Sequence, residues 1–361
     1  MRADPRKDKT LLRALTQVAP GTALRAGIDD IIRAELGALI IIGEPNRLAF
    51  LFSGGMRLDL PFTAQLLYEL AKMDGAIVVN TPVSKLVYAN VQLMPDPSIP
   101  SAETGTRHRT AERVAKQTEA LVVSISQQRE TVTIFVDELR YQLAEISELL
   151  ARTNQALGTL ETYRQRLEQG FTRLTALEFQ SAVMLDDVLV VLQRAEMTSR
   201  MAEEIERNCV ELGAEGRLIR MQLDELMEDV PRDKVAVVHD YEMSGEPAAA
   251  ARVLEQLSTL PQNKLLEFEE LAELLGYPRD ANPIDYTVSP RGYRVLSRIP
   301  RLPDAVIRQI LADFPSLDEV IRASHRDLEA VDGVGSVRAR EIREGLRRLQ
   351  EHNLVDRYLQ L

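Results

Sequence analysis

Short apolar runs alternate with amphipathic segments through the first third of the chain. Runs bounded by turn residues predict β-strands, and they cover residues 38–44, 47–55, 76–80, 86–94, 120–126 and 131–136. Apolar residues spaced three and four apart predict helices, and such segments cover residues 10–19, 27–37, 62–73 and 110–119. This mixture of strands and helices predicts an α/β domain with a mixed sheet over residues 1–136.

The apolar period changes after residue 136. Apolar side chains now follow a three-and-four alternation at Leu139, Leu143, Ile146, Leu150, Leu157 and Leu160, which Leu167, Phe171 and Leu174 continue. Such spacing gives a helix one apolar stripe. Because no proline occurs between residues 101 and 230, an all-α helical spine is expected over residues 137–286. Within it, residues 230–247 are expected to form a loop or linker, and the prolines and glycines of 276–293 mark the next boundary.

The last segment, residues 287–361, contains an internal repeat of helix, tight turn and helix. At an offset of 32 residues (328 minus 296), the copies align as Leu296 with Leu328, Ile299 with Val331, Leu302 with Val334, Arg308 with Arg340 and Ile310 with Ile342. The second turn has Gly333 and Gly335, which permit a left-handed φ and let a phosphate approach the backbone. The first copy has Arg301 and Pro303 there, and because proline offers no N–H this copy is expected to be a structural partner.

This repeat resembles the helix-hairpin-helix motif, which holds duplex or junction DNA by its phosphates without reading bases. The resemblance implies DNA contacts from Gly333, Val334, Gly335, Ser336, Arg338 and Arg340, with Val334 filling the gap between the helices. The alternative is a glycine turn between packed helices that binds no ligand.

Charge is distributed unevenly along the chain. Of the formal net charge of −11, residues 128–286 contribute −15 (16 basic, 31 acidic), whereas residues 287–361 have 13 basic and 11 acidic groups, a net +2. All 13 basic residues of the last segment are Arg, whose planar, multi-donor group matches phosphate. The acidic total therefore does not argue against nucleic-acid binding by the last segment, and the acidic middle is best explained as a solvated helical surface.

Cys209 is the only cysteine, which excludes an intramolecular disulfide and a cysteine-based zinc site. The N-terminal stretch is charged, and the longest apolar run, residues 36–42, is far shorter than the roughly 20 residues of a membrane span. We therefore expect a cytoplasmic protein with no membrane partner.

Two short motifs suggest phosphate chemistry. Arg107, His108 and Arg109 stand at the expected start of a helix, where cations oppose the helix dipole, so their placement suggests an anionic ligand. Asp74-Gly75 lies between a predicted helix and a strand, where a carboxylate beside a glycine can hold a divalent metal. Alone, Asp-Gly is best explained as a turn, and the Arg-His-Arg run as a charged first helical turn. Neither a GxxxxGK[ST] phosphate loop nor a GxGxxG fingerprint is present.

Together, Asp74-Gly75-Ala76 and the Arg-His-Arg run within VQLMPDPSIPSAETGTRHRTAERVAKQT (91–118) closely resemble the diadenylate cyclase (DAC) domain family. The order of a DAC domain, a helical spine and a helix-hairpin-helix domain also resembles that of the bacterial DNA-scanning members of this family. The resemblance implies that two ATP condense to cyclic di-AMP and two pyrophosphates, with Mg²⁺ or Mn²⁺. It also implies one ATP per subunit, catalysis between facing subunits, a homo-octamer, suppression by branched, Holliday-junction-like DNA, and a nucleoid-associated location in the bacterial cytoplasm.

The family's roles map onto matching positions of this sequence. Asp74 is expected to bind the metal and activate the ribose 3′-hydroxyl. Gly75 and Ala76 are expected to line the ribose and phosphate approach, and Leu93 to contact adenine. The remaining expected ATP contacts, all to phosphate, are Thr106, Arg107, His108, Arg109, Thr110 and Ser126. Lys72 has no assigned role.

Two alternatives remain at this point. One is a DNA-binding scaffold that senses ATP without catalysis. The other is a nucleotidyltransferase that modifies DNA ends, against which the absence of a nucleophilic Lys motif or a carboxylate triad counts.

Overall fold

The computed structural model describes residues 5–279 and 282–359. These residues fold into two compact units. The N-terminal unit comprises residues 5–155 and 204–222, and the C-terminal unit comprises the described residues of 156–203 and 223–359. No described helix is both long and apolar enough to cross a bilayer.

The described part of the N-terminal unit contains an eight-stranded mixed sheet, as the apolar runs predict. Its strand order is β2-β5-β4-β1-β6-β7-β8, with β3 also paired to β5. Strands β1 and β4 are parallel, and the other pairs are antiparallel. The strands are β1 Ala38–Ile42, β2 Phe52–Ser53, β3 Met56–Pro61, β4 Ala76–Val79, β5 Lys85–Leu93, β6 Leu121–Ser126, β7 Thr131–Val136 and β8 Leu139–Gln142.

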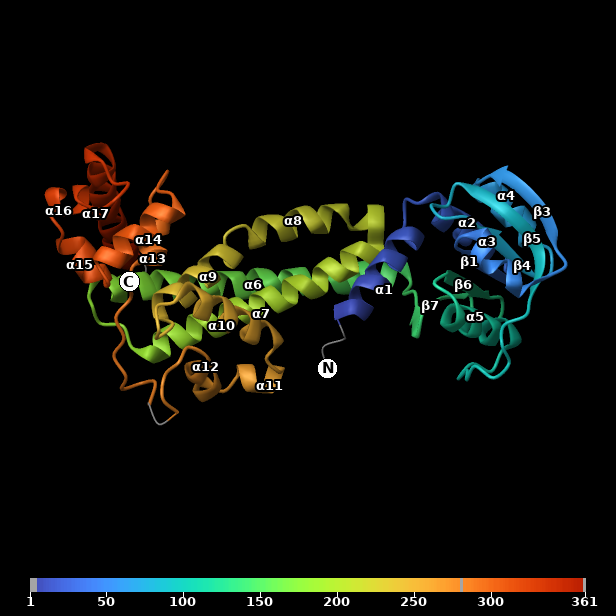
Figure 1. Cartoon of the computed structure of the whole chain (residues 1–361), viewed down its shortest axis with the longest axis horizontal. Coiled ribbons are helices and arrows are strands. Elements are labelled where there is room, and N and C mark those ends of the chain that lie inside the picture. The colour runs from blue at the N-terminus through green and yellow to red at the C-terminus, as the bar shows by residue number, and fades with distance from the viewer. Residues whose placement is uncertain (1–4, 280–281, 360–361) are drawn as a thin grey trace. The chain divides into compact units, whose positions relative to one another are not determined.

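Helices cover both faces of this sheet, which explains why its central strands are apolar along their whole length. Along β1, Ile40 and Ile42 pack with helices α1, α2 and α4, whereas Leu39 and Ile41 pack with α5. Figure 1 shows where these helices lie about the sheet. The helices of this layer structure are α1 Pro5–Val18, α2 Ala23–Arg33, α3 Pro45–Leu48, η1 Ala49–Leu51, α4 Ala64–Leu70 and α5 Thr106–Gln117. The strand predicted at 47–55 is wrong over most of its length, because α3 and η1 occupy residues 45–51.

Long helices follow the sheet, as the spine prediction requires. The apolar alternation is wrong at its start, since Leu139 lies in β8 and the first long helix begins at Ile146. The expected loop at 230–247 is also wrong, because residues 230–241 form α9, with Pro231 in its first turn, where proline is compatible with a helix. The helices are α6 Ile146–Phe179, α7 Leu185–Leu212, η2 Gly213–Gly216, α8 Arg217–Met227, α9 Val230–Tyr241, α10 Pro247–Thr259, α11 Gln262–Leu265 and α12 Phe268–Leu274.

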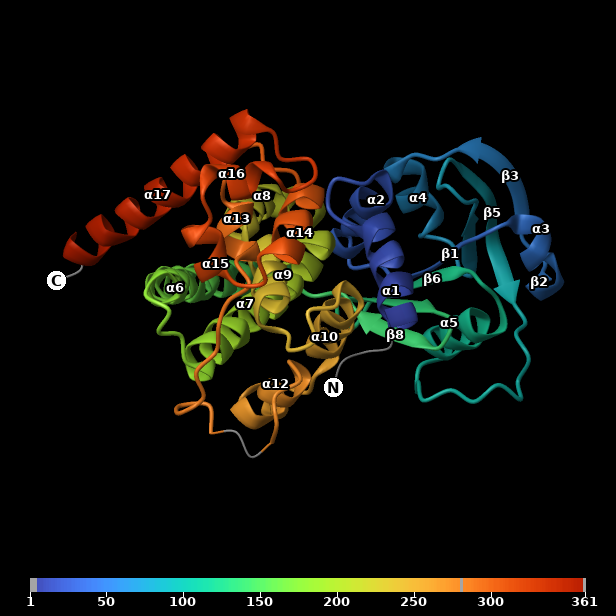
Figure 2. The same cartoon turned by 60° about the vertical axis from the view of Figure 1, so that its left-hand side comes forward.

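Both copies of the 32-residue repeat form two helices joined by a tight turn. The first copy is α13 Tyr293–Ser297 and α14 Asp304–Asp313; after α15 Leu317–Arg322, the second is α16 His325–Glu329 and α17 Ser336–Leu359. The matched apolar positions, among them Leu296 and Leu328, share one core around which α13 to α16 gather at the start of α17 (Figure 2). Gly333 has φ +77°, and Arg301, its counterpart in the first copy, has φ +62°. Gly335 has no positive φ, so the left-handed freedom expected there is not used.

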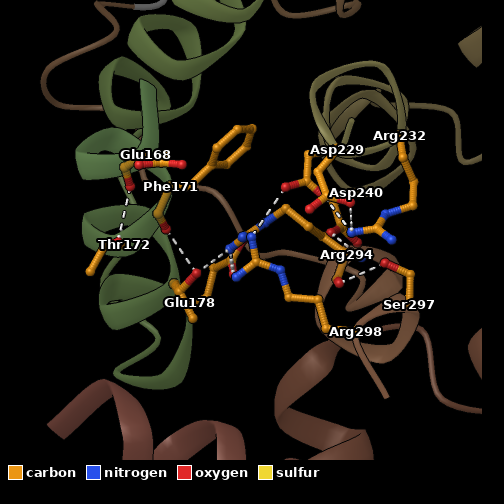
Figure 3. Close-up of polar contacts among 12 residues, drawn as sticks. Glu168, Phe171, Thr172, Glu178, Asp229, Arg232, Asp240, Arg294, Ser297 and Arg298 are labelled. Carbon is orange, nitrogen blue, oxygen red and sulfur yellow. Dashed lines mark hydrogen bonds and ion pairs between the residues drawn. The ribbon is translucent and has the colours of Figure 1, made fainter. Parts of the chain in front are cut away.

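A buried ionic cluster ties α13 to α6 and α9 within the C-terminal unit (Figure 3). Arg294 is fully buried, forms an ion pair with Glu178 and donates a hydrogen bond to Thr175 Oγ1 at 2.9 Å. The Asp240 carboxylate accepts hydrogen bonds from the backbone N–H groups of Gly292 (2.7 Å), Tyr293 (2.6 Å) and Arg294 (2.9 Å), and so caps α13. Burial, followed by the charge of Glu178, raises the pKa of Asp240 to about 7.

Candidate active site

A cavity of about 530 Å³ opens in the N-terminal unit beside the start of β4 and the start of α5. Predicted site residues from both motifs meet there, although some thirty residues separate the motifs in sequence. The predicted residues in its lining are Gly75, Ala76, Leu93, Thr106, Arg107, His108, Thr110 and Ser126. Asp74 and Arg109 are exposed and adjoin lining residues in sequence without lining the cavity themselves.

Gly75 is required by the backbone around it. Its φ is +91°, in the left-handed region that favours glycine. A Cβ atom at this position would lie 2.9 Å from the carbonyl carbon of Asn90 and 3.0 Å from the carbonyl oxygen of Val91. The glycine therefore lets the turn that bears Asp74 lie directly against β5, at the wall of the cavity.

The N-terminus of α5 presents donors and positive charge to the cavity. Gly105 is the N-cap, and no side chain caps the helix, so the first backbone N–H groups are not satisfied by a cap. The first turn contains no acidic residue, and the cavity lining contains Arg107 and His108 but no carboxylate. An uncapped helix N-terminus with an arginine beside it favours an anionic ligand.

Two arginines of the first turn lie in different environments. The Arg107 guanidinium lines the cavity, with NH1 donating to the carbonyl oxygen of Ile125 at 3.4 Å. Gly37 makes room for it, since a Cβ on Gly37 would lie 2.1 Å from NH1. Arg109 instead donates to the carbonyl oxygens of Glu103 (3.3 Å) and Thr104 (3.2 Å), which fixes the loop before the helix.

His108 is half-buried, with its ring edge toward the Phe135 ring at a centroid distance of 6.4 Å. Burial lowers the pKa of His108 below its usual value, and the charges of Arg107, Arg140 and Arg129 lower it further, while Glu103 opposes them. These effects favour the neutral form of the imidazole beside the cavity.

The loop that joins β5 to α5 is anchored by side chains of α5. Glu112 is buried and accepts hydrogen bonds from the Ala102 N–H at 3.1 Å and the Ser101 hydroxyl at 2.5 Å. Lys116 pairs with Glu112 at 2.8 Å and donates to the carbonyl oxygen of Pro100 at 2.9 Å. Because this loop connects Leu93 to Arg107, these contacts fix the two sides of the cavity relative to each other.

Asp74 offers one carboxylate to a divalent cation, and a bound triphosphate would supply further oxygen ligands. Among the described residues, no cluster of three or more His, Cys, Asp or Glu side chains could hold a metal ion. Mg²⁺ is commonly held by one or two carboxylates together with substrate phosphates, so one carboxylate beside a phosphate-binding helix suits it.

Several cavity residues were not predicted from the sequence. They are Leu39, Val91, Gln92, Gly105, Gln127 and Gln128 in the lining, and Gly37 and Glu112 behind it. Val91, Gln92, Gly105 and Glu112 had a signal in the sequence, because they lie within the motif at residues 91–118. Lys72 forms an ion pair with Glu69 at 2.8 Å and lies over the Tyr68 ring, so it has a structural explanation.

The predicted DNA-binding residues lie together in the C-terminal unit. Val334 is buried in the repeat core, as expected for a residue that fills the gap between helices. Gly333, Gly335, Ser336, Arg338 and Arg340 are exposed. Arg338 NH1 donates to the Gly333 carbonyl oxygen at 2.6 Å, which closes the turn across the start of α17.

Comparison with known proteins identifies the family to which this chain belongs. The DAC sequence model, described as the nucleotide-binding region of the DisA bacterial checkpoint controller, matches residues 25–139, and the model of the DisA linker region matches residues 143–283. The DNA integrity scanning protein DisA of Carboxydothermus hydrogenoformans is 47% identical over 345 residues, which cover 96% of this chain and 98% of that protein. DisA of Acetivibrio thermocellus is 46% identical, with 98% of each chain covered, and DisA of Frankia alni is 45% identical, with 99% of this chain and all of that protein covered.

The chain belongs to the DisA family. The DAC region of DisA proteins is a diadenylate cyclase, a nucleotidyltransferase that makes cyclic di-AMP from ATP, and this chain is such an enzyme. All predicted nucleotide-site residues, from Asp74 to Ser126, fall inside the matched DAC region. The predicted α/β cyclase domain followed by a helical region is confirmed. DAC enzymes use divalent metal ions.

Proposed function

We propose that each cavity holds one ATP and that two subunits bring their cavities face to face. The ribose 3′-oxygen of each ATP then attacks the α-phosphorus of the other. A new P–O bond forms, the bond to pyrophosphate breaks, and the hydroxyl proton is released. Two such steps give cyclic di-AMP and two pyrophosphates. One cavity of about 530 Å³ is of the size that encloses a single small ligand, so the second nucleotide must come from another subunit.

The observation that carries this proposal is the uncapped, cationic N-terminus of α5, which opens on a cavity without carboxylates. In the proposed complex, the backbone N–H groups of Thr106 and Arg107 and the Arg107 guanidinium hold phosphate oxygens. The hydroxyl groups of Thr106 and Ser126 and the imidazole of His108 orient them. The Thr110 hydroxyl donates to the Thr106 carbonyl oxygen at 2.9 Å, so it must turn from that oxygen to donate to a phosphate. In-line phosphoryl transfer depends mainly on such positioning and charge neutralisation.

The other predicted residues have roles at the edges of the cavity. Leu93, at the end of β5, contacts adenine, and Gly75 and Ala76 face the ribose and the phosphates. Arg109 supports the phosphate site by fixing the loop at Glu103 and Thr104. Asp74 holds Mg²⁺ or Mn²⁺ together with the triphosphate, and when bound the ion offsets phosphate charge.

The C-terminal repeat is the proposed DNA-binding element, and the relatives' name, DNA integrity scanning protein, supports this. The turn at Gly333 to Ser336, with Arg338 and Arg340, would hold the phosphate backbone of branched, Holliday-junction-like DNA. Binding there would suppress cyclic di-AMP synthesis in a homo-octamer located at the nucleoid in the bacterial cytoplasm.

Asp74→Asn tests the cyclase site. Wild type incubated with ATP and Mg²⁺ or Mn²⁺ should produce cyclic di-AMP, separated by chromatography, and the variant should lose nearly all product while remaining folded. Asp59→Asn is the matched control, because Asp59 is an exposed carboxylate of the same unit paired with Arg57. An ATP-binding, assembled wild type that makes no cyclic di-AMP would favour a scaffold that senses ATP without catalysis.

A second experiment tests regulation. A four-way junction added to the wild type should lower the rate of cyclic di-AMP formation more than an unbranched duplex of the same length. Equal rates with and without DNA, at concentrations where the protein binds it, would contradict the proposed regulation.

A further inference from the structure

A groove on the C-terminal unit has no role in the function described so far. It encloses about 560 Å³ between the end of α6, helix α15, the start of α16 and one face of α17. Its lining includes the apolar side chains of Phe179, Ile321 and Leu346 and the arginines Arg340, Arg343 and Arg347. We call this the α17 groove.

The three arginines follow one face of α17. Their spacing of three and four residues places them on the same side of the helix. With a rise of 1.5 Å per residue, Arg340 and Arg347 are separated by about 10 Å along the helix axis. Like charges at this spacing on one helix face repel each other and destabilise the helix. A polyanion bound in the groove would offset the repulsion among these arginines.

These guanidinium groups are poorly neutralised by the protein. Among the described residues, Arg340 and Arg343 form no ion pair. Arg347 pairs with Glu351 at 2.7 Å, but both side chains are largely exposed, and such surface pairs are weak and easily exchanged. Glu344, the acid in the lining, lies 3.4 Å from Arg348, which does not line the groove.

The dimensions favour an extended ligand. A row of charges about 10 Å long exceeds one phosphate group, whereas a DNA strand has a phosphate every 3.4 Å along the helix axis. The groove also lies next to the repeat turn, because His325 in its lining is 3.2 Å from the Ser336 hydroxyl through Nε2.

We infer that the α17 groove is a second contact site for the DNA backbone, so that bound DNA follows α17 beyond the glycine turn. This inference rests on the proposed DNA binding of the C-terminal repeat. Arg343 and Arg347 bind phosphates in this arrangement, Arg340 serves both the turn and the groove, and the apolar side chains of the lining contact deoxyribose.

The test measures binding of a labelled duplex and a labelled four-way junction to the full-length protein over a series of salt concentrations. Arg343→Ala and Arg343→Ala/Arg347→Ala are compared with Arg348→Ala, which removes the same charge from the same helix outside the groove. Each phosphate contact contributes about 0.9 to the slope of log K against log salt concentration. We expect the slope to fall by about 0.9 in the single variant and about 1.8 in the double variant, and to change little in Arg348→Ala.

The outcomes separate this inference from the function on which it rests. A wild type that binds no DNA even at low salt would overturn both. Tight binding by the wild type, with the groove variants losing no more slope than Arg348→Ala, would overturn the groove alone. Unlabelled cyclic di-AMP is added as a competitor. If cyclic di-AMP displaces DNA from the wild type, and the double variant no longer binds cyclic di-AMP, the groove is a nucleotide site and the inference is wrong. Unchanged hydrogen exchange of peptides covering α16 and α17 in all variants controls for folding of the C-terminal unit.

Discussion

Charged residues gather in two regions of this molecule in opposite ways. At the start of α5, Arg107 and an uncapped helix N-terminus open on a cavity whose lining contains no acid. At the start of α13, Arg294 is sealed inside the C-terminal unit, with Glu178 paired to it and Asp240 capping the helix. The first region lacks its counter-charge, and the second contains its own.

This difference separates a binding site from a structural one. A charged side chain that is exposed to solvent and has no counter-charge in the protein can exchange its bound water for a ligand. It can therefore bind substrate. A charge buried with its partners has no such freedom, because removing either partner leaves an uncompensated charge in a medium of low dielectric. Burial and pairing therefore decide which arginine cluster acts on substrate.

The largest expected loss of stability comes from disrupting the buried cluster of Arg294, Glu178 and Asp240. Arg294→Met removes the cation that faces Glu178, and we expect the C-terminal unit to lose about 3–5 kcal/mol of stability. Hydrogen exchange of peptides covering α9 and α13 measures this loss in that unit. Arg308→Met, which removes an exposed arginine paired with Asp304 at 3.6 Å, should cost about 0–1 kcal/mol. Equal effects in the two variants would contradict the comparison.

Breaking the open region should affect activity and leave stability intact. Arg107→Ala is expected to lower cyclic di-AMP formation about 10²–10³-fold, the range for loss of one donor to a transition state. Gly37→Ala should reduce activity in the same direction with Arg107 still present, because its Cβ occupies the position of the guanidinium. The rate of Arg47→Ala, an exposed arginine 3.5 Å from Glu119, should match that of wild type. A melting temperature lowered by Arg107→Ala would instead indicate a structural role.

The sealed region should also make stability depend on pH. The pKa of Asp240 is about 7 in the fold and near 3.8 when unfolded, so between these values the folded chain binds the extra proton. Stability of the C-terminal unit should therefore fall as pH rises from about 4 to about 7, by up to roughly 1.4 kcal/mol per pH unit. Asp240→Asn should flatten this dependence in hydrogen exchange measured at several pH values, and parallel profiles for both proteins would argue against it.

The smallest effect is expected at Glu112, a paired and buried carboxylate in the helix that borders the nucleotide cavity. This residue tests whether a paired charge beside the site supports the structure without contacting substrate. Glu112→Gln keeps its shape but weakens the contacts to Ser101, Ala102 and Lys116, for an expected loss of about 1 kcal/mol in stability. Activity should fall several-fold, mainly through a higher KM for ATP, since the loop beside the cavity loosens. Glu119→Gln, on the exposed end of the same segment, serves as the control. A loss as large as that of Arg107→Ala would mean that Glu112 contacts the substrate.

Local signals in the sequence determined much of this protein. Apolar runs such as residues 38–44 and 131–136 gave strands because both sheet faces are buried. The 32-residue repeat predicted two turns with matching cores. Motif residues from Asp74 to Ser126 were expected to form one site, and the structure places eight of the ten in one cavity lining. Errors arose where local patterns are ambiguous: residues 47–51 and 230–241 proved helical, the latter because proline is tolerated in a first helical turn.

Only the tertiary structure decided which charged side chains remain exposed without a counter-charge and which are buried with their partners. The sequence around Arg294 does not distinguish it from Arg298 or Arg301. No neighbouring residue predicts that Glu178 and Asp240 are its partners. Likewise, Gly37 accommodates Arg107 from a strand start seventy residues away. The physical reason is that burial and pairing are set by contacts between distant segments, whereas periodicity and turn chemistry act over only a few residues.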